Sequence, residues 1–302
     1  FLPAVFDQMK TGDGLYQVAT AFQLDTMVGD AAVIGSEPGL RFARLEELKQ
    51  QHSDRDLFFS DLSRERLMNH LAYACFTDFL DWETGECRFD SDSFVRLMEL
   101  IKSLPSLDDV VSSWSDPNNE IIGTDESLRQ GKILLSEMSL NSVANFQQMQ
   151  VLLPGRAVYV GFPTDKGVGN ILRTKNSFSI SSACAHKDGA WQFIRYLLLQ
   201  ARDSVDPSNP YVGFPTSQAA FDQCVAYYRA DGDGAGDYPL GDADVAQLNT
   251  LIASAKSAVS YDQQLDDIIQ SEAARFFAGQ CTAEEMAKKV QSRAGIYINE
   301  QR

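Results

Sequence analysis

The residues best spaced for chemistry form an acidic, glycine-rich run, Asp231-Gly-Asp-Gly-Ala-Gly-Asp237. Counted from Asp231, positions 1 and 3 are aspartates and position 6 is glycine, as in a calcium-binding EF-hand loop. Position 5 is Ala235, however, and position 12 is an aspartate in place of the bidentate glutamate. Calcium at Asp231, Asp233 and Asp237 is therefore a weak alternative to an acidic loop without a metal, and we predict no cofactor.

Other catalytic patterns are missing from the sequence. His52, His70 and His186 are far apart in the chain, and there is no nucleophile elbow, dinucleotide fingerprint or Walker loop. Asp262 and Asp266 would suit a carbohydrate-active enzyme if they lay about 5–9 Å apart across a cleft. Aspartates at a helix start also serve as caps, so this pair has a structural alternative. Because the sequence has no recognisable catalytic pattern, we predict that the protein is not an enzyme.

The elements that position these residues alternate between strands and helices. Two helix boundaries are defined by local chemistry: a glycine at Gly279, and a capping box from Thr282 to Glu285. Apolar periodicity predicts the others. The predicted strands lie in 15–34, 134–138, 158–164 and 178–184, the last two around a turn. The predicted helices lie in 44–51, in 64–80, after Asp90 or Ser91, in 124–131, in 139–150 and in 188–199, and 112–119 is predicted to be a loop.

Composition restricts the partners. The chain has 302 residues with 26 basic and 42 acidic side chains, a net charge of −16, which argues against nucleic acid and anionic lipid. No apolar run approaches the roughly 20 residues that span a bilayer. The opening residues, Phe1 to Phe6, lack the basic region of a signal peptide. The five cysteines are scattered and leave the compartment undecided.

Five segments, in order along the chain, carry a family resemblance. They resemble the extracellular solute-binding proteins of bacterial ABC importers, family 1, to which the maltose-binding protein belongs. The segments are Leu128-Arg-Gln-Gly-Lys-Ile-Leu-Leu-Ser-Glu-Met138, Val160-Gly-Phe-Pro-Thr-Asp-Lys-Gly167, Ser179-Ile-Ser-Ser-Ala-Cys184 with the helix after it, Gly213-Phe-Pro-Thr-Ser-Gln-Ala-Ala-Phe221, and Phe277 to Glu285 followed by Gln291 to Glu300.

The resemblance implies an α/β fold of the periplasmic-binding-protein-like class II, in which two lobes share hinge crossings. It places 1–18 and 170–238 in the remainder of lobe 1 and the hinge, and 19–169 and 239–302 in lobe 2. Family members usually begin with further residues that form most of the first lobe. We therefore expect that lobe to be incomplete in this chain.

The function implied by the resemblance is capture of a small solute, most often a sugar or oligosaccharide, for the membrane subunits of an ABC permease. The protein would be extracellular, as a cell-surface lipoprotein or in the periplasm. Two lobes would close over the ligand by hinge motion. The alternatives are a secreted sensor or interaction protein on the same fold and, third, a carbohydrate-active enzyme.

The resemblance also selects candidate ligand-binding residues in three places: after a strand, at the return toward the hinge, and at the start of the penultimate helix. Tryptophans in polar surroundings are further candidates as stacking platforms. Each has a structural alternative, which is helix capping, a tight turn or packing. The candidates are Asn141, Ser142, Asn170, Tyr261, Asp262, Asp266, Trp82 and Trp114.

Overall fold

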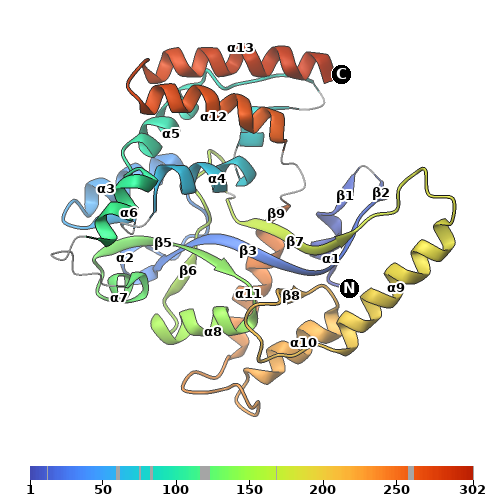
Figure 1. The fold of residues 1–302 in the computed structure, drawn as a ribbon. Coiled ribbons are helices and arrows are strands. Elements are labelled where there is room, and N and C mark those ends of the chain that lie inside the picture. Colours follow the sequence, from blue (N-terminus) through green and yellow to red (C-terminus); the bar gives the residue numbers. More distant parts are fainter. Residues whose placement is uncertain are drawn as a thin grey trace. The chain divides into compact units, whose positions relative to one another are not determined.

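The computed structural model describes residues 1–11, 13–58, 62–74, 76–81, 84–115, 123–167, 169–257 and 262–301. The chain divides into two compact units (Figure 1). The first unit contains residues 1–37, 137–161 and 170–259, and the second contains 38–136, 162–169 and 260–302. The predicted lobes, 1–18 with 170–238 and 19–169 with 239–302, divide the chain at other residues, and they stay a prediction.

The first unit is built on a long central strand, β3 (Val18–Asp30). It pairs antiparallel with β6 (Ala157–Tyr159), β7 (Ile171–Phe178) and β8 (Phe214–Pro215), and β9 (Lys256–Ser257) runs parallel to β7. β5 (Ile133–Leu140) begins in the second unit and ends in the first. Phe22 and Leu24 of β3 are fully buried, and from Leu24 to Asp30 the strand is buried on both faces, so it runs through the core of the unit.

Helices and a short hairpin complete the first unit. Its longest helix, α9, buries Ile194 and Leu198 and contacts β3. The elements are α1 (Pro3–Asp7), β1 (Lys10–Thr11), β2 (Gly14–Leu15), α2 (Ala31–Ile34), α8 (Val143–Leu152), α9 (Lys187–Asp203), α10 (Gln218–Tyr227) and α11 (Asp242–Ser254).

The second unit is mainly helical. Its strand β4 (Asp56–Phe58) pairs in parallel with the start of β5. Phe94 is the centre of an aromatic cluster, with ring centroids of Phe79 and Phe89 each 5.2 Å away. The helices are α3 (Phe42–Gln51), α4 (Arg64–Ala74), the 3₁₀ helix η1 (Phe76–Phe79), α5 (Asp92–Lys102), α6 (Leu107–Trp114), α7 (Thr124–Arg129), α12 (Gln263–Phe277) and α13 (Ala283–Gln301).

Local signals predicted helix boundaries well. The Ser91 hydroxyl accepts a bond from the Phe94 N–H and caps α5, as predicted. The capping box before α13 is also confirmed, since Thr282 and Glu285 exchange backbone-to-side-chain bonds of 3.0 and 3.2 Å. Among the described residues, no helix has both the length and the hydropathy needed to cross a membrane.

Two predicted segments were wrong. A strand was predicted in 178–184, but the strand is β7 and ends at Phe178, and a turn follows before α9. Alternating charged residues in β7 concealed it from a search for apolar runs. The loop predicted in 112–119 begins inside α6, which continues to Trp114, while 116–119 lie outside the described residues.

Candidate functional site

Five polar side chains from neighbouring strands occupy one face of the first unit's sheet. β3 supplies Gln23 and Asp25, β7 supplies Arg173 and Lys175, and β5 supplies Ser139; we call this set the polar face. Residues i and i+2 of a strand point to the same side, and Gln23 lies opposite Arg173 in the β3–β7 register. The polar side chains of the two strands therefore align on one face of the sheet.

Asp25 is the centre of the polar face. It is only 1% exposed, and its carboxylate lies 2.6 Å from Arg173 Nε. Its other carboxylate oxygen, Oδ1, accepts hydrogen bonds from Ser139 Oγ at 2.7 Å and from Gln23 Nε2 at 3.0 Å. A buried carboxylate needs such partners because it has lost its water.

Asn141 extends the polar face at the end of β5. Its Oδ1 accepts a hydrogen bond from Lys175 Nζ at 2.6 Å, and its Nδ2 donates to the Ser139 carbonyl at 3.3 Å. Asn141 and Lys175 are both half-buried, and Ser139 is exposed. Part of the polar face is therefore accessible to a ligand from solvent.

The electrostatics of the polar face differ from those of the whole chain. Arg173 and Lys175 provide two cations against the single carboxylate of Asp25, in a protein whose net charge is −16. The set contains amide, hydroxyl, ammonium, guanidinium and carboxylate groups. Such a mixture of donors and acceptors can hold a ligand rich in hydroxyl groups, because each hydroxyl both donates and accepts.

The predicted residue Ser142 follows Asn141 but has a structural role. It is buried, and its hydroxyl caps α8 by accepting a bond from the Asn145 N–H at 3.2 Å. Asn170 is also buried, with its Oδ1 2.6 Å from Thr26 Oγ1 and its Nδ2 3.2 Å from Ser254 Oγ. Of the predicted residues in the first unit, only Asn141 joins the polar face.

Three of the predicted residues in the second unit lie within its described part, on α12, at its cap and on α6. Asp262 caps α12 by accepting a 2.7 Å bond from the Leu265 N–H, and it also accepts a 2.9 Å bond from the Tyr297 hydroxyl. Asp266, half-buried, lies in the first turn of that helix. Trp114 is the last residue of α6 and is 51% exposed.

Two predicted residues, Trp82 and Tyr261, lie outside the described residues. Asp262 has the capping role that was its structural alternative, with one hydrogen bond accepted by each carboxylate oxygen. Whether any of the predicted residues contacts a ligand stays a prediction.

The acidic run between α10 and α11, the weak calcium candidate, shows no grouping of three carboxylates in the described structure. Within the described ranges, no three histidine, cysteine, aspartate or glutamate side chains converge as metal ligands, so Asp231, Asp233 and Asp237 are not brought together. Gln147 Nε2 instead donates to the carbonyl of Ala235, at position 5 of the proposed calcium loop, at 2.8 Å. This loop is held by α8 through hydrogen bonds.

Sequence analysis missed most of the polar face. Asp25 and Gln23 alternate with Phe22 and Leu24, and that alternation is the signal that would have marked them. Arg173 and Lys175 alternate in the same way. Their convergence depends on the β3–β7 register, which joins residues about 150 positions apart and has no local signature.

The sequence matches no family model and no curated protein. The structure, in contrast, is similar to many solved structures. The sugar-binding protein MalE from Xanthomonas citri aligns with a TM-score of 0.57 and 13% identity over 100% of this chain and 75% of that one. The chain has the fold of a solute-binding protein.

Two further structures support this conclusion about the fold. An extracellular solute-binding protein of family 1 from Alicyclobacillus acidocaldarius aligns with a TM-score of 0.52 and 16% identity, over 98% of this chain and 75% of that one. A solute-binding protein of an ABC transporter from Thermotoga lettingae, solved with α-D-tagatose, has a TM-score of 0.51 and 13% identity, over 98% and 76%. The predicted α/β class and fold are thereby confirmed.

Proposed function

We propose that the protein binds a small carbohydrate outside the cell and delivers it to the membrane subunits of an ABC importer. The observation that carries the proposal is the polar face, with Asp25 held between Arg173 and Ser139 and with Lys175 bonded to Asn141. The solved structures of similar fold support it, since they include a sugar-binding protein and a protein bound to tagatose.

The ligand class follows from the chemistry of the polar face. Lys175 and Arg173 donate and Asn141 both donates and accepts, which suits neighbouring hydroxyls of a sugar ring. Asp25 is 1% exposed and holds Arg173 in place. Because the strands fix these side chains through bonds to one another, little conformational entropy is lost when a ligand binds. The permease as partner, and a periplasmic or lipoprotein location, belong to the same proposal.

The test is calorimetric titration of the protein with monosaccharides and oligosaccharides, including maltose, tagatose and xylo-oligosaccharides. We expect at least one sugar to bind and to be weakened by Lys175→Met. Loss of a hydrogen bond from a charged group costs about 1.5–3 kcal/mol, which is at least about tenfold in affinity.

The matched control is Lys187→Met, which removes the same charge at an exposed position on α9 outside the polar face. It should leave the affinity unchanged. If no sugar binds the unmodified protein, or if both substitutions weaken binding equally, the proposed function is wrong.

A further inference from the structure

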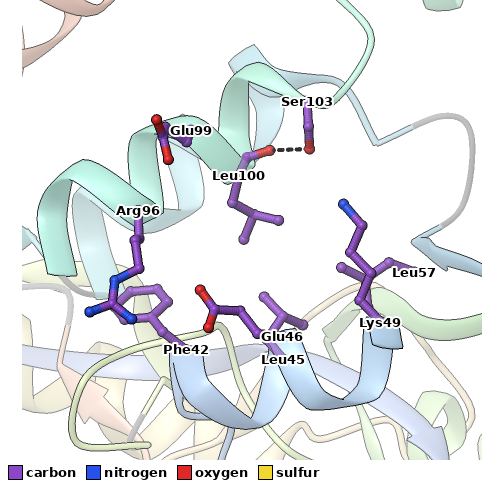
Figure 2. Close-up of a pocket in the computed structure, with 9 residues that line it drawn as sticks. All are labelled: Phe42, Leu45, Glu46, Lys49, Leu57, Arg96, Glu99, Leu100 and Ser103. Atoms are coloured by element: carbon purple, nitrogen blue, oxygen red, sulfur yellow. Dashed lines mark hydrogen bonds between the residues drawn. The ribbon is translucent and has the colours of Figure 1, made fainter. Parts of the chain in front are cut away.

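A pocket of about 240 Å³ lies between α3 and α5 of the second unit (Figure 2). Its apolar lining comes from three elements: Phe42 and Leu45 from α3, Leu57 from β4 and Leu100 from α5. Figure 2 shows Leu45 and Leu100 on opposite sides of the cavity. The volume is below the roughly 300–1,000 Å³ of pockets that hold drug-sized ligands, so the pocket suits a smaller molecule.

Four charged side chains, two of each sign, complete the lining of the pocket, and we call them the rim charges. Glu46 and Lys49 are three residues apart on α3, and Arg96 and Glu99 have the same spacing on α5. Figure 2 shows Glu46 and Lys49 extending from α3 toward α5, and Arg96 extending from α5 toward α3. The pocket therefore combines an apolar interior with a rim in which the positive and negative charges balance.

The rim charges are exposed and unpaired. None of the four makes a salt bridge or a side-chain hydrogen bond with the described chain. Other exposed side chains with the same spacing do pair, such as Arg44 with Glu47 at 3.2 Å on α3 and Lys10 with Asp7 at 2.6 Å. The rim charges are thus available to a ligand. A ligand with a single charge would meet as much repulsion as attraction there, whereas a zwitterion can use both signs.

A free α-amino acid has the chemistry that this pocket complements. Its ammonium and carboxylate groups are bonded to the same carbon atom, so they lie close together. Side chains at positions i and i+3 of a helix are neighbours as well, with Cβ atoms about 5–6 Å apart. Glu46 and Lys49 can therefore bind the two charged groups of one molecule, while its apolar side chain leaves water for the space between Leu45 and Leu100.

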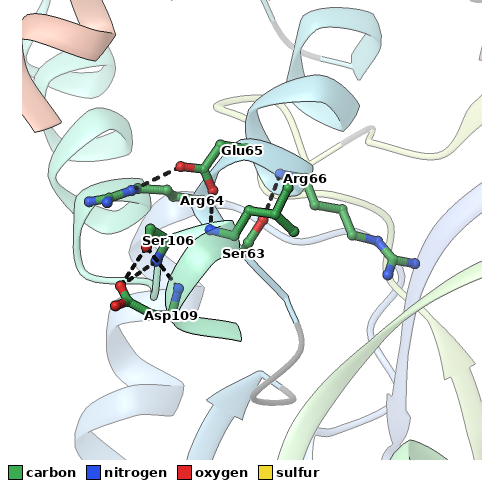
Figure 3. A network of polar contacts seen from close by, with 7 residues as sticks. Ser63, Arg64, Glu65, Arg66, Ser106 and Asp109 are labelled. Carbon is green, nitrogen blue, oxygen red and sulfur yellow. Dashed lines mark hydrogen bonds and ion pairs between the residues drawn. The ribbon is translucent and has the colours of Figure 1, made fainter. Parts of the chain in front are cut away.

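The α5 wall of the pocket is held in place by a polar network (Figure 3). In the turn after α5, the Pro105 carbonyl accepts a 2.9 Å bond from the Arg64 N–H of α4. Glu65 of the same helix accepts a 2.8 Å bond from the Leu107 N–H, and the Ser106 hydroxyl caps α6. Because this wall needs no ligand to order it, less conformational entropy is lost on binding.

We propose that this pocket binds a free α-amino acid with an apolar side chain, such as leucine. Glu46 accepts hydrogen bonds from its ammonium group, Lys49 donates to its carboxylate, and the two rim charges of α5 contribute the same pair of signs from the facing helix. The apolar side chain lies between Leu45 and Leu100. This is a second ligand site, in the second unit, and it does not depend on sugar binding at the polar face.

The test is calorimetric titration of the protein with leucine, isoleucine, valine and methionine. At least one should bind, and glycine, which has the same charges without the side chain, should bind at least about tenfold more weakly than the tightest of the four. The amide of that amino acid lacks the carboxylate and its N-acetyl derivative lacks the ammonium group, so each should bind about fivefold more weakly. No binding of the four amino acids at about 10 mM, or equal binding of glycine, would overturn the proposal.

Two substitutions test the assigned contacts. Glu46→Gln and Lys49→Gln should each weaken the amino acid about fivefold, because each removes one exposed contact between opposite charges. Glu47→Gln is the matched control, since it removes the same charge one residue away on α3, outside the pocket, and should leave the affinity unchanged. Equal effects of Glu46→Gln and Glu47→Gln would contradict the assignment. If Lys175→Met weakens the amino acid instead, the ligand binds at the polar face and the proposal is refuted.

Discussion

Replacing Asp25 with alanine should destabilise the first unit more than any surface substitution. The carboxylate is 1% exposed and has three partners, Arg173 at 2.6 Å, Ser139 at 2.7 Å and Gln23 at 3.0 Å. Removing one member of a buried pair costs about 3–5 kcal/mol, because the other charge is left without compensation. Arg173 is 26% exposed and regains some water, so we expect about 3 kcal/mol, measured as the free energy of unfolding in urea.

A double-mutant cycle separates the lost pair from the general cost of substitution. Asp25→Ala combined with Arg173→Met leaves no uncompensated charge, so the double variant should recover part of the loss. The coupling energy should be about 2 kcal/mol, since groups in direct contact couple by about 0.5–3 kcal/mol. Additive effects of the two substitutions would refute the reasoning, because they would mean that Arg173 does not depend on Asp25.

A surface pair of equal length is the control. Arg202 Nε and Asp203 Oδ1 are also 2.6 Å apart, but their side chains are 46% and 54% exposed. Asp203→Ala should therefore cost less than about 1 kcal/mol, because exposed ion pairs contribute little. If Asp203→Ala costs as much as Asp25→Ala, burial is not the source of the effect.

Three further predictions concern other parts of the chain. Glu272→Gln should lower the free energy of unfolding by about 2–3 kcal/mol in urea, because this 8% exposed carboxylate pairs with Arg293 at 2.7 Å; no change would mean that the pair is not formed. Thr282→Ala should cost about 1 kcal/mol by removing the cap of α13, and Thr282→Ser, which keeps the hydroxyl, should cost less in the same assay. Burial raises the pKa of Cys224 from 9.0 to about 11, so its thiolate fraction, and its alkylation rate by mass spectrometry, should be about a hundredfold below those of an ordinary thiol at pH 8. The folded state favours the protonated thiol, so this contribution to stability is complete below pH 9 and is lost as pH rises through 11; rapid alkylation at pH 8 would contradict the burial.

The parts of the fold that sequence predicted correctly depend on neighbours in the chain. Ser91 and Thr282 cap their helices through bonds to residues three positions away, so the signal lies within one turn. Gly279 ends the predicted stripe with a φ of 72°, a conformation that favours glycine. In each case the physical cause and the sequence pattern occupy the same few residues.

The candidate site depended on contacts that no local pattern encodes. Asp25 meets Ser139 and Arg173 only after three strands have paired, and a different register would separate them. Asn141 was predicted from a family resemblance, and its bond to Lys175 was not. Asn170 is the opposite case: a polar residue near a turn was proposed for a ligand, and the structure shows it bonded to buried Thr26 and exposed Ser254.

The division of each unit into three separate chain segments limits how such a protein can be altered by recombination. A single crossover between two related genes exchanges everything on one side of a point, so it would replace parts of both units at once. The first unit would then combine its residues 1–37 from one parent with residues 137–161 and 170–259 from the other. Asp25 and Arg173 would come from different parents whenever the crossover fell between these two residues. Novel specificity in this architecture is therefore accessible mainly through point substitutions on the polar face, and gene shuffling should yield few folded chimeras.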